Sequence, residues 1–332
     1  MKRIGVLLLM MVLVGALAFA AGQGETADGP IRMTLGTSQP PEGGFLGELP
    51  FKFAEYLAEE SNGRIELTVH HSGSLSANER ELMEMAQAGS VDFAIGATTY
   101  VLGWAPSFKV FDLPFLFEDV DHFRNVVFGE VGEILADEVS EHGVELVGFI
   151  LPGFRGVFSA RRPVTSIDDL QGLKIRSMES PVYVEMFRSL GMLPTPMPAS
   201  ELYTALQTGV VDAGENDPAS VVSWGWIDVI QYYMLNNHTL SANVMVMNQR
   251  RLESLSPELQ EAVRRAAIRA SEYQLDYIQG AWADSLRQIR EKGITVTEIE
   301  DFSAFQAEVA HIVDQYDAEI GKGIVQMVRD AR

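Results

Sequence analysis

One arginine stands out among the residues that could bind a small molecule. Arg176 closes the segment DLQGLKIR, whose last residues have the pattern of a short strand, and SMESP follows it rather than an adjacent carboxylate. A planar guanidinium binds a carboxylate through two parallel charge-assisted hydrogen bonds, which lysine cannot reproduce. Such bonds count for more in a closed, dry cleft than at the surface. Arg176 is therefore either an exposed strand-end charge or the anion-binding residue of a cleft.

The usual arrangements of catalytic and metal-binding residues are missing from the sequence. It has no cysteine, no Gly-x-Ser-x-Gly turn, no Walker loop and no Gly-x-Gly-x-x-Gly motif. His70 and His71 are adjacent, but without a metal-ligand spacing they are interpreted as surface residues at a strand end. Carboxylate pairs are too frequent in this acidic chain to single out an acid–base site. The sequence predicts no catalytic residue, no metal site and no cofactor.

Charge and the N-terminal segment indicate an exported protein that does not bind nucleic acid. The 332 residues include 46 acidic and 25 basic side chains, whereas phosphate binding requires a basic surface. Residues 1–20 begin with two basic residues, continue through an apolar run and end in the Ala-x-Ala site Ala18–Ala20, the pattern of a cleavable signal peptide. The apolar run is shorter than the about 20 residues of a membrane span. We expect a protein that is not embedded in a membrane, and the lack of cysteine excludes disulfides and a lipid anchor on cysteine.

Hydrophobic periodicity alternates between strands and helices along the rest of the chain. Residues 21–30 are small and polar and form a predicted disordered leader. Segments 31–38 and 65–71 have the pattern of strands around an amphipathic helix, and another helix leads to a strand at 91–95. A later strand ends near Ile150, after which a second set of strands and helices begins, with a predicted loop at MLPTPMP (192–198). This alternation is typical of parallel sheets in α/β proteins.

The longest predicted helix lies near the C-terminus. It begins with Ser256 as N-cap and Pro257 at the first helical position, and its pattern runs to Lys292 before Gly293. At about 1.5 Å per residue such a helix is roughly 54 Å long, which exceeds one small domain. The length of the chain also fits two domains of about 150 residues better than one. We therefore expect this helix to bridge two domains.

Several blocks of sequence resemble a known family in their order and spacing. The blocks are GFRG (153–156), SIDDLQGLKIR (166–176), LGMLPTPM (190–197), SELYTALQTGVVDAGEN (200–216) and NHT (237–239). They follow one another as in the extracytoplasmic solute-binding proteins of TRAP (tripartite ATP-independent periplasmic) transporters, which are receptors for dicarboxylates and sugar acids. Similar segments upstream, such as FDLPFLF, and the long helix downstream extend the resemblance over essentially the mature chain.

The resemblance implies a fold, a location and a set of partners. The expected fold is α/β, a two-lobed periplasmic-binding-protein clamshell with crossing hinge strands and a long helix that spans both lobes. Lobe I would comprise residues 31–152 and about 242–281, and lobe II residues 153–241 and about 282–332, with the ligand cleft between them. The protein would be a periplasmic receptor that captures a small organic acid and delivers it to the small and large membrane permease subunits, without a cofactor.

The resemblance also assigns ligand-binding roles to single residues. In the family, the arginine that closes the GLKIR strand binds the ligand carboxylate, and Arg176 occupies that place. Arg155 matches a second arginine that helps to hold the carboxylate, and Asn216 matches an asparagine that donates to it. Asn243 matches a polar contact from the crossing segment. Thr98 falls where a hydroxyl-bearing residue faces the ligand.

Three further residues have alternative roles. Glu79 and Arg80 fall at a loop-to-helix start that approaches the cleft, but they could equally pair with each other on the surface. Glu215 could accept hydrogen bonds from ligand hydroxyls. An acid beside a carboxylate site otherwise weakens binding, so this role requires a ligand with sugar-like hydroxyls.

Departures from the family pattern bear on the identity of the ligand. Ala199 stands where many members have an aromatic residue, and Ala97 and Tyr100 stand where some members place a charged pair, so the distal pocket is not that of a sialic-acid binder. Polar residues such as Glu215 and Asn243 favour a sugar acid, and a C4-dicarboxylate or keto acid is the alternative. From other classes, the alternatives are a secreted α/β enzyme acting on an acidic sugar and an ABC-type binding protein.

Overall fold

The computed structural model describes residues 29–41 and 45–332 of the chain. The predicted signal peptide and most of the predicted leader lie outside these residues. Residues 32–332 form one compact unit. Within the described ranges, no helix has both the length and the apolar character that a membrane span requires.

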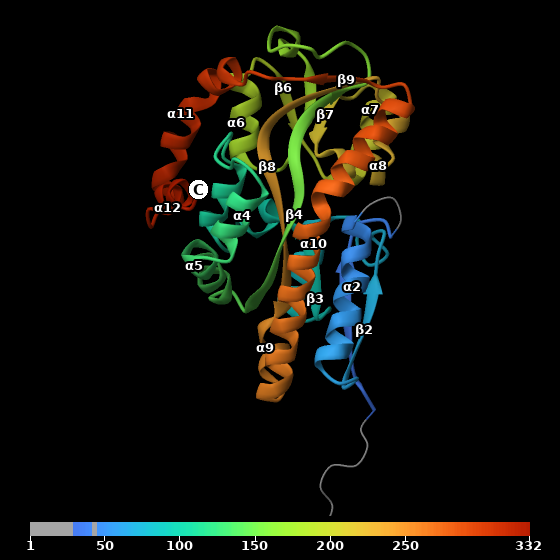
Figure 1. Cartoon of the computed structure of the whole chain (residues 1–332), viewed down its shortest axis with the longest axis vertical. Helices are drawn as coiled ribbons and strands as arrows, with labels where there is room; N and C mark the ends of the chain where they lie inside the picture. The colour runs from blue at the N-terminus through green and yellow to red at the C-terminus, as the bar shows by residue number, and fades with distance from the viewer. Residues whose placement is uncertain (1–28, 42–44) are drawn as a thin grey trace, which may run out of the picture. The chain divides into compact units, whose positions relative to one another are not determined.

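A nine-stranded sheet runs through the described residues (Figure 1). Its strands are β1 (Ile31–Thr37), β2 (Ile65–His70), β3 (Phe93–Ala97), β4 (Val144–Ser159), β5 (Lys174–Ser177), β6 (Leu193–Pro196), β7 (Ala213–Asn216), β8 (Tyr232–Asn248) and β9 (Thr295–Glu298). They lie in the order β2-β1-β3-β8-β4-β7-β5-β6, and β9 also pairs with β8. The pairs β1–β3, β5–β6, β5–β7 and β8–β9 are parallel, whereas β4 and β8 are antiparallel to their other neighbours. The sheet is therefore mixed, with parallel strands on both sides of two long antiparallel strands.

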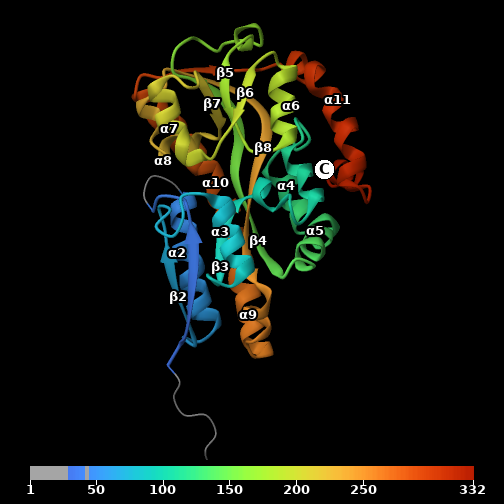
Figure 2. The same ribbon diagram turned by 180° about the vertical axis from the view of Figure 1, so that it is seen from behind.

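The two long strands connect the two parts of the sheet. β4 and β8 pair along most of their length, from Val144 opposite Asn248 to Ser159 opposite Tyr232. Figures 1 and 2 show them side by side, leading from the part that contains β3 to the part that contains β7. Because β3 pairs with β8 and β7 pairs with β4, both parts depend on this pair of strands. The expectation of crossing strands is confirmed.

The prediction that a strand ends near Ile150 was wrong. β4 continues through Pro152 and Gly153, and its pairing with β8 shifts in register between Ile150 and Gly153. Proline lacks an N–H group, and a bulge is one of the few places in a sheet that accept it. Gly153 has φ 149°, and a Cβ atom there would lie 2.5 Å from Nε1 of Trp282. The Pro-Gly pair therefore marks an irregularity within a continuous strand.

The helix predicted between residues 38 and 65, the one before residue 91 and the long helix from Pro257 are present, and the described residues form further helices that were not predicted one by one. The helices are α2 (Phe45–Glu60), α3 (Glu79–Ala88), α4 (Val120–Val127), α5 (Glu130–Ser140), α6 (Pro181–Ser189), α7 (Ala199–Thr208), α8 (Pro218–Ser223), α9 (Gln249–Glu253), α10 (Pro257–Glu291), α11 (Ser303–Ile320) and α12 (Ile324–Asp330), with 3₁₀ turns η1 (Thr98–Val101), η2 (Pro106–Asp112), η3 (Asp168–Leu170) and η4 (Trp226–Asp228). Residues 193–196 were predicted as a loop but form β6. This strand lies at the edge of the sheet, where its two prolines interrupt no interior ladder.

The long helix α10 contacts both parts of the sheet. Its 35 residues begin as predicted, because the side chain of Ser256 accepts a hydrogen bond from the N–H of Leu259. It packs against α2, β4 and α8. The side-chain amide of Gln274 bonds to both the N–H and the C=O of Leu151, and the indole of Trp282 donates to the carbonyl of Pro152. The spanning helix is confirmed, and it is hydrogen-bonded to the irregular segment of β4.

Two groups of apolar side chains hold the helices on the sheet. One surrounds Phe111, and the centre of its ring lies 5.7 to 6.0 Å from the ring centres of Phe117, Phe149 and Phe123. The other surrounds Trp226 and includes buried side chains of α7, β8 and α10. The FDLPFLF segment belongs to the first group, in agreement with its interpretation as packing.

Candidate functional site

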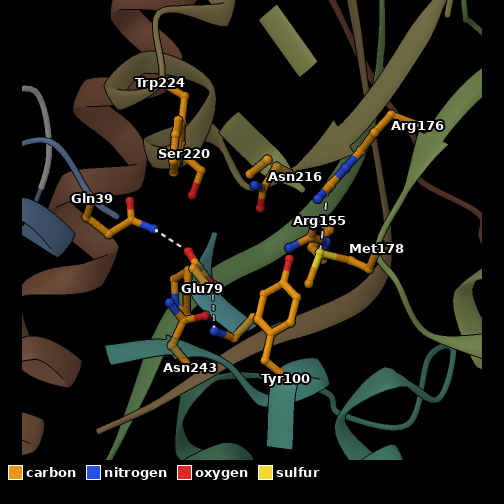
Figure 3. Close-up of a pocket in the computed structure, with 13 residues that line it drawn as sticks. Gln39, Glu79, Tyr100, Arg155, Arg176, Met178, Asn216, Ser220, Trp224 and Asn243 are labelled. Carbon is orange, nitrogen blue, oxygen red and sulfur yellow. Dashed lines mark hydrogen bonds between the residues drawn. The ribbon is translucent and has the colours of Figure 1, made fainter. Parts of the chain in front are cut away.

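A cavity lies where the carboxyl ends of the parallel strands meet the two crossing strands (Figure 3). Its volume is about 390 Å³ when the open mouth is included. The lining residues are Gln39, Glu79, Ala97, Tyr100, Pro152, Arg155, Arg176, Met178, Ala199, Asn216, Ser220, Trp224 and Asn243. Ligands of open α/β sheets bind outside the carboxyl ends of the strands. The cavity is therefore in the place expected for a ligand site.

The structure brings five of the eight predicted ligand-binding residues to the cavity wall. These are Arg176, Arg155, Asn216, Asn243 and Glu79. The other three, Glu215, Thr98 and Arg80, do not line it. The direct ligand contacts of all eight residues stay predictions.

Arg176 is fully buried and presents one free donor to the cavity. Its Nε donates to the carbonyl of Met197 at 2.8 Å, and its Nη1 lies 3.6 Å from Sδ of Met178 and 3.6 Å from Oε1 of Glu215. Nη2 is buried without a hydrogen-bond partner among the described residues. Burial lowers the pKa of the guanidinium, and the Glu215 carboxylate opposes this effect. A buried donor without a partner is costly, so this nitrogen is suited to receive an acceptor from a ligand.

Arg155 is held by a buried ion pair with Glu215. The two residues lie on neighbouring strands, β4 and β7, and Nε and Nη2 of Arg155 each donate to a different carboxylate oxygen of Glu215. Nη2 also donates to the backbone carbonyl of Glu215 at 3.1 Å. Burial alone would raise the pKa of Glu215, but Arg155 and His238 outweigh it and lower the pKa to about 2. The structure thus places Glu215 behind the wall, as the partner of Arg155.

Glu215 is shared unequally by two guanidinium groups at that end of the cavity. It binds Arg155 through two hydrogen bonds, whereas Nη1 of Arg176 lies 3.6 Å from it. The buried carboxyl groups of Asp112 and Asp217 also interact with Arg155. His238, whose Nε2 lies 3.5 Å from Glu215, has its pKa lowered by burial. Arg176 is therefore the less closely paired guanidinium, and its end of the cavity is suited to an anionic group.

The two asparagines enter the cavity from β7 and β8. The side-chain oxygen of Asn216 accepts a hydrogen bond from the N–H of Asp217 at 3.0 Å, which leaves its NH₂ group free to donate. Asn243 lies opposite Ala97 of β3 and Ile150 of β4 in the sheet register. Both residues line the cavity and are buried. A ligand in the cavity would therefore meet their amides with little competition from water.

Glu79 is a buried carboxylate at the start of α3. Its Oε1 accepts from the hydroxyl of Ser38 at 2.6 Å and from Nε2 of Gln39 at 3.5 Å, and its Oε2 accepts from the N–H of Ala97 at 2.9 Å. No ion pair joins Glu79 to Arg80 in the described part of the chain. The Arg80 guanidinium instead lies 5.4 Å from the centre of the Tyr100 ring. The alternative in which Glu79 and Arg80 pair on the surface is contradicted.

The hydroxyl of Thr98 has a structural partner. It donates to the carbonyl of Ala242 at 3.1 Å and so connects η1 to β8. The residue is 2% exposed and does not line the cavity. In this structure Thr98 supports the wall from behind.

Four lining residues with functional side chains were missed by the sequence analysis. Gln39 directly follows β1, Met178 follows β5, and Ser220 and Trp224 lie in and at the end of α8. The signal for Gln39 was available, because β1 is parallel to β3 and its carboxyl end lies at the same edge of the sheet. The indole of Trp224 stacks on Trp226, with ring centres 5.9 Å apart and planes 11° apart.

The buried carboxyl group of Asp112, near the site, is expected to make the stability of the protein depend on pH. Asp112 is 2% exposed, its Oδ1 accepts from Thr99 at 3.4 Å, and its Oδ2 has no hydrogen-bond partner among the described residues. Burial raises the pKa of Asp112 from 3.8 to about 7. The folded protein therefore binds this proton more tightly than the unfolded chain does, and stability falls as pH rises from about 4 to about 7.

We expect Asp112→Asn to remove this loss of stability. The variant should be more stable than the wild type at pH 8, by up to about 4 kcal/mol, and the difference should shrink towards pH 4. The measurement is the melting temperature of both proteins across this pH range. Asp284→Asn, at a side chain that is 65% exposed, is the control and should show no such trend. A constant difference between Asp112→Asn and the wild type at all pH values would contradict the expectation.

Comparison with known sequences identifies the type of protein. The family model DctP, described as "Bacterial extracellular solute-binding protein, family 7", matches residues 37–319. A solute-binding protein of Chromohalobacter salexigens is 33% identical over 267 residues, which cover 80% of this chain and 79% of that protein. The match thus extends over both sets of strands and the cavity.

Comparison with solved structures agrees with the sequence match. The sugar acid binding protein DctPAm from Advenella mimigardefordensis, in complex with galactonate, has a TM-score of 0.87 and 28% identity, with 92% of this chain and 98% of that chain covered. A TRAP periplasmic solute-binding protein from Chromohalobacter salexigens, with bound D-glucuronate, has a TM-score of 0.85 and 31% identity, with coverage of 91% and 100%. The predicted two-lobed α/β clamshell fold is confirmed.

Proposed function

The chain belongs to the bacterial extracellular solute-binding proteins of family 7, and we propose that it is a periplasmic receptor of a TRAP transporter that captures a sugar acid by its carboxylate. The family and the structural neighbours are transport proteins that bind solutes. One observation carries the proposal: Nη2 of Arg176 is buried at the cavity without a hydrogen-bond partner among the described residues. A ligand carboxylate supplies both the missing acceptor and the missing negative charge.

The geometry of Arg176 is suited to a carboxylate. Its Nε is bonded to the carbonyl of Met197 and its Nη1 lies 3.6 Å from Sδ of Met178, so Nη2 is the nitrogen without a partner among the described residues. The planar guanidinium would bind both oxygens of a carboxylate when the ligand replaces the weak contact of Nη1 with sulfur. The free NH₂ group of Asn216 is a further donor for the same group. Arg155 contributes its charge, while its orientation is maintained by Glu215.

The rest of the wall supports a hydroxylated ligand. Glu79, Ser220 and Asn243 offer polar atoms, and the Trp224 indole offers an apolar face for C–H groups. The structural neighbours from Advenella mimigardefordensis and Chromohalobacter salexigens hold galactonate and D-glucuronate. By this analogy we propose a sugar acid as ligand. A C4-dicarboxylate or keto acid in the same receptor role is the alternative.

We further propose that the two lobes close on the ligand and that the closed receptor delivers it to the small and large permease subunits. Residues 31–152 with about 242–281 would move against residues 153–241 with about 282–332. The irregular segment of β4 at Ile150–Gly153 is suited to act as a hinge, because its ladder with β8 is already interrupted there. Small-angle scattering should show a more compact protein with saturating ligand, and identical profiles would contradict closure.

Ligand binding is expected to stabilise the protein. A ligand that binds only the folded state adds about 2.7 kcal/mol at 100 times its dissociation constant. In a thermal-shift screen over uronates, aldonates, dicarboxylates and keto acids, the sugar acids should therefore raise the melting temperature of the protein. A screen in which only dicarboxylates or keto acids stabilise the protein would favour the alternative ligand.

Whether the bound ligand is chemically changed distinguishes a receptor from an enzyme acting on an acidic sugar. A receptor returns its ligand unchanged after the complex is denatured. Mass spectrometry of the released ligand should find only the compound that was added. A converted product that forms at catalytic turnover would overturn the proposed receptor function.

A further inference from the structure

The wall of the cavity opposite Arg176 carries a negative charge and lacks a positive one. Figure 3 shows Arg176 and Met178 on one side and Gln39, Glu79, Ser220 and Trp224 on the other. Among the described residues that line the cavity, the cationic side chains are Arg155 and Arg176, and Arg155 is paired with Glu215. The two ends of the cavity therefore differ in charge, with a guanidinium at one end and a carboxylate at the other.

The carboxylate of Glu79 is fixed in place and is not neutralised by a neighbour. Three donors from Ser38, Gln39 and Ala97 hold its two oxygens. No lysine, arginine or histidine of the described chain lies within ion-pairing distance of it. The side chain is only 8% exposed, so water screens the charge poorly. A group that enters this end of the cavity meets a rigid negative charge.

The two polar neighbours of Glu79 add acceptors. Gln39 turns its NH₂ group to Glu79, and its Oε1 is then a buried acceptor without a hydrogen-bond partner in the described residues. Ser220 donates its hydroxyl hydrogen to Asp217 at 2.6 Å, so its oxygen offers only lone pairs to the cavity. An occupant of this end must bring hydrogen-bond donors to satisfy these atoms.

Two other groups at the wall can donate but carry no charge. Asn243 has a neutral amide, and burial and then the Glu79 charge raise the pKa of Tyr100, so its hydroxyl keeps its proton. Both residues can bond to a ligand hydroxyl as donor or acceptor. Neither offsets the negative charge of Glu79, and the Arg80 guanidinium, 5.4 Å from the centre of the Tyr100 ring, does not line the cavity. A second carboxylate would therefore remain repelled.

We propose that Glu79 makes the site selective for acids with a single carboxylate, because it accepts from a hydroxyl at the far end of the ligand and repels a second carboxylate there. This inference rests on the proposed function, in which Arg176 binds the first carboxylate. It narrows the ligand class to monocarboxylic polyhydroxy acids, such as aldonates and uronates. It places aldarates and C4-dicarboxylates among the rejected compounds.

The test compares acids that share one carbon skeleton. Galactonate and galactarate have the same hydroxyls at carbons 2 to 5 and differ only in a CH₂OH or a carboxylate at carbon 6, and gluconate and glucarate form a second pair. We expect isothermal titration calorimetry of the mature protein to show at least about tenfold tighter binding of the monoacid in each pair, since like charges brought together in an interface are strongly unfavourable.

Glu79→Gln tests whether this residue is the cause. The variant keeps the shape of the side chain, removes its charge and adds a hydrogen-bond donor. The affinity for the aldarate should therefore rise, and the affinities for the monoacid and the aldarate should come within about threefold of each other. Glu81→Gln is the matched control, because it removes the same charge from an exposed position on the same helix and should keep the wild-type ratio. Glu79→Asp, which retains the charge, should still reject the aldarate.

The outcomes separate this inference from the function on which it rests. Equal binding of monoacid and aldarate by the wild type would overturn the selectivity and leave the receptor function standing. A ratio that is unchanged in Glu79→Gln would assign the selectivity to another group and also overturn the inference. If none of these acids binds the wild type, the proposed sugar-acid receptor itself is wrong.

Discussion

Arg176→Ala is expected to weaken binding of the sugar acid by roughly 30-fold or more, because loss of one partner of a buried charge pair costs about 2 to 5 kcal/mol and each 1.4 kcal/mol is tenfold in affinity. The bound carboxylate would lose its main counter-charge at a buried position, since Arg176 is 0% exposed. Nη2 of Arg176 is the buried donor that such a carboxylate would satisfy.

Calorimetric titration with the acid identified in the screen measures this effect. Arg176→Lys should also bind weakly, since lysine keeps the charge but loses the pair of parallel donors. Arg287→Ala is the control, because this arginine is 59% exposed on α10 and pairs with Asp284. Unchanged affinity in Arg176→Ala would remove the centre of the proposed function.

The stability of Arg176→Ala has to be measured in parallel. Arg176 has an acidic neighbour in the empty site, because its Nη1 lies 3.6 Å from Oε1 of Glu215. Glu215 keeps its bidentate contact with Arg155 when Arg176 is removed. We therefore expect a folded variant with a modest change in melting temperature. A variant that fails to fold would show that Arg176 serves the scaffold.

Glu215→Gln is expected to destabilise the protein by about 3 to 5 kcal/mol, because it removes the carboxylate that binds the buried Arg155 guanidinium through two hydrogen bonds. Glu215 and Arg155 are 0% and 2% exposed, so water cannot replace the lost partner. The pKa of Glu215, lowered to about 2, shows the same dependence on its cationic neighbours. The loss should appear at neutral pH, where the carboxylate of the wild type is charged.

Urea unfolding of the wild type and a set of variants tests this expectation. Arg155→Gln combined with Glu215→Gln removes both charges, so the double variant should lose less than the sum of the two single variants. Glu298→Gln, at a 67% exposed ion pair with Arg290, is the control and should cost no more than about 1 kcal/mol. Additive losses in the double variant would show that the two charges do not stabilise each other.

Local signals were sufficient for most helices and for the strand of Arg176. The limits of α10 follow from Ser256 and Pro257 at its start and Gly293 after its end, all of which act within a few residues. The segment before Arg176 was predicted as a strand from its apolar residues and forms β5. β6 was missed, because the prolines of LPTP oppose a strand except at the edge of a sheet. Edge position is a property of the sheet and is not visible in the segment.

The residues of the cavity could be predicted only in part. Arg176, Arg155, Asn216, Asn243 and Glu79 were named from a resemblance of sequence blocks, and all five line the cavity. The resemblance supplied candidate positions without their hydrogen-bond partners. Gln39 was missed although it directly follows a predicted strand. Ser220 and Trp224 were missed, because single polar or aromatic residues in or after a short helix carry no distinctive pattern.

The sequence by itself determined the acidic composition, the alternation of strands and helices, the long C-terminal helix and the arginine that could bind an anion. The tertiary structure alone decided which charges meet. It pairs Arg155 with Glu215, 60 positions away, and leaves Arg176 with an unsatisfied donor. It also buries Glu79 without a cation at the far end of the cavity. The physical reason is that an ion pair depends on distance in space and on desolvation, and both are set by the pairing of β4, β7 and β8 rather than by spacing along the chain.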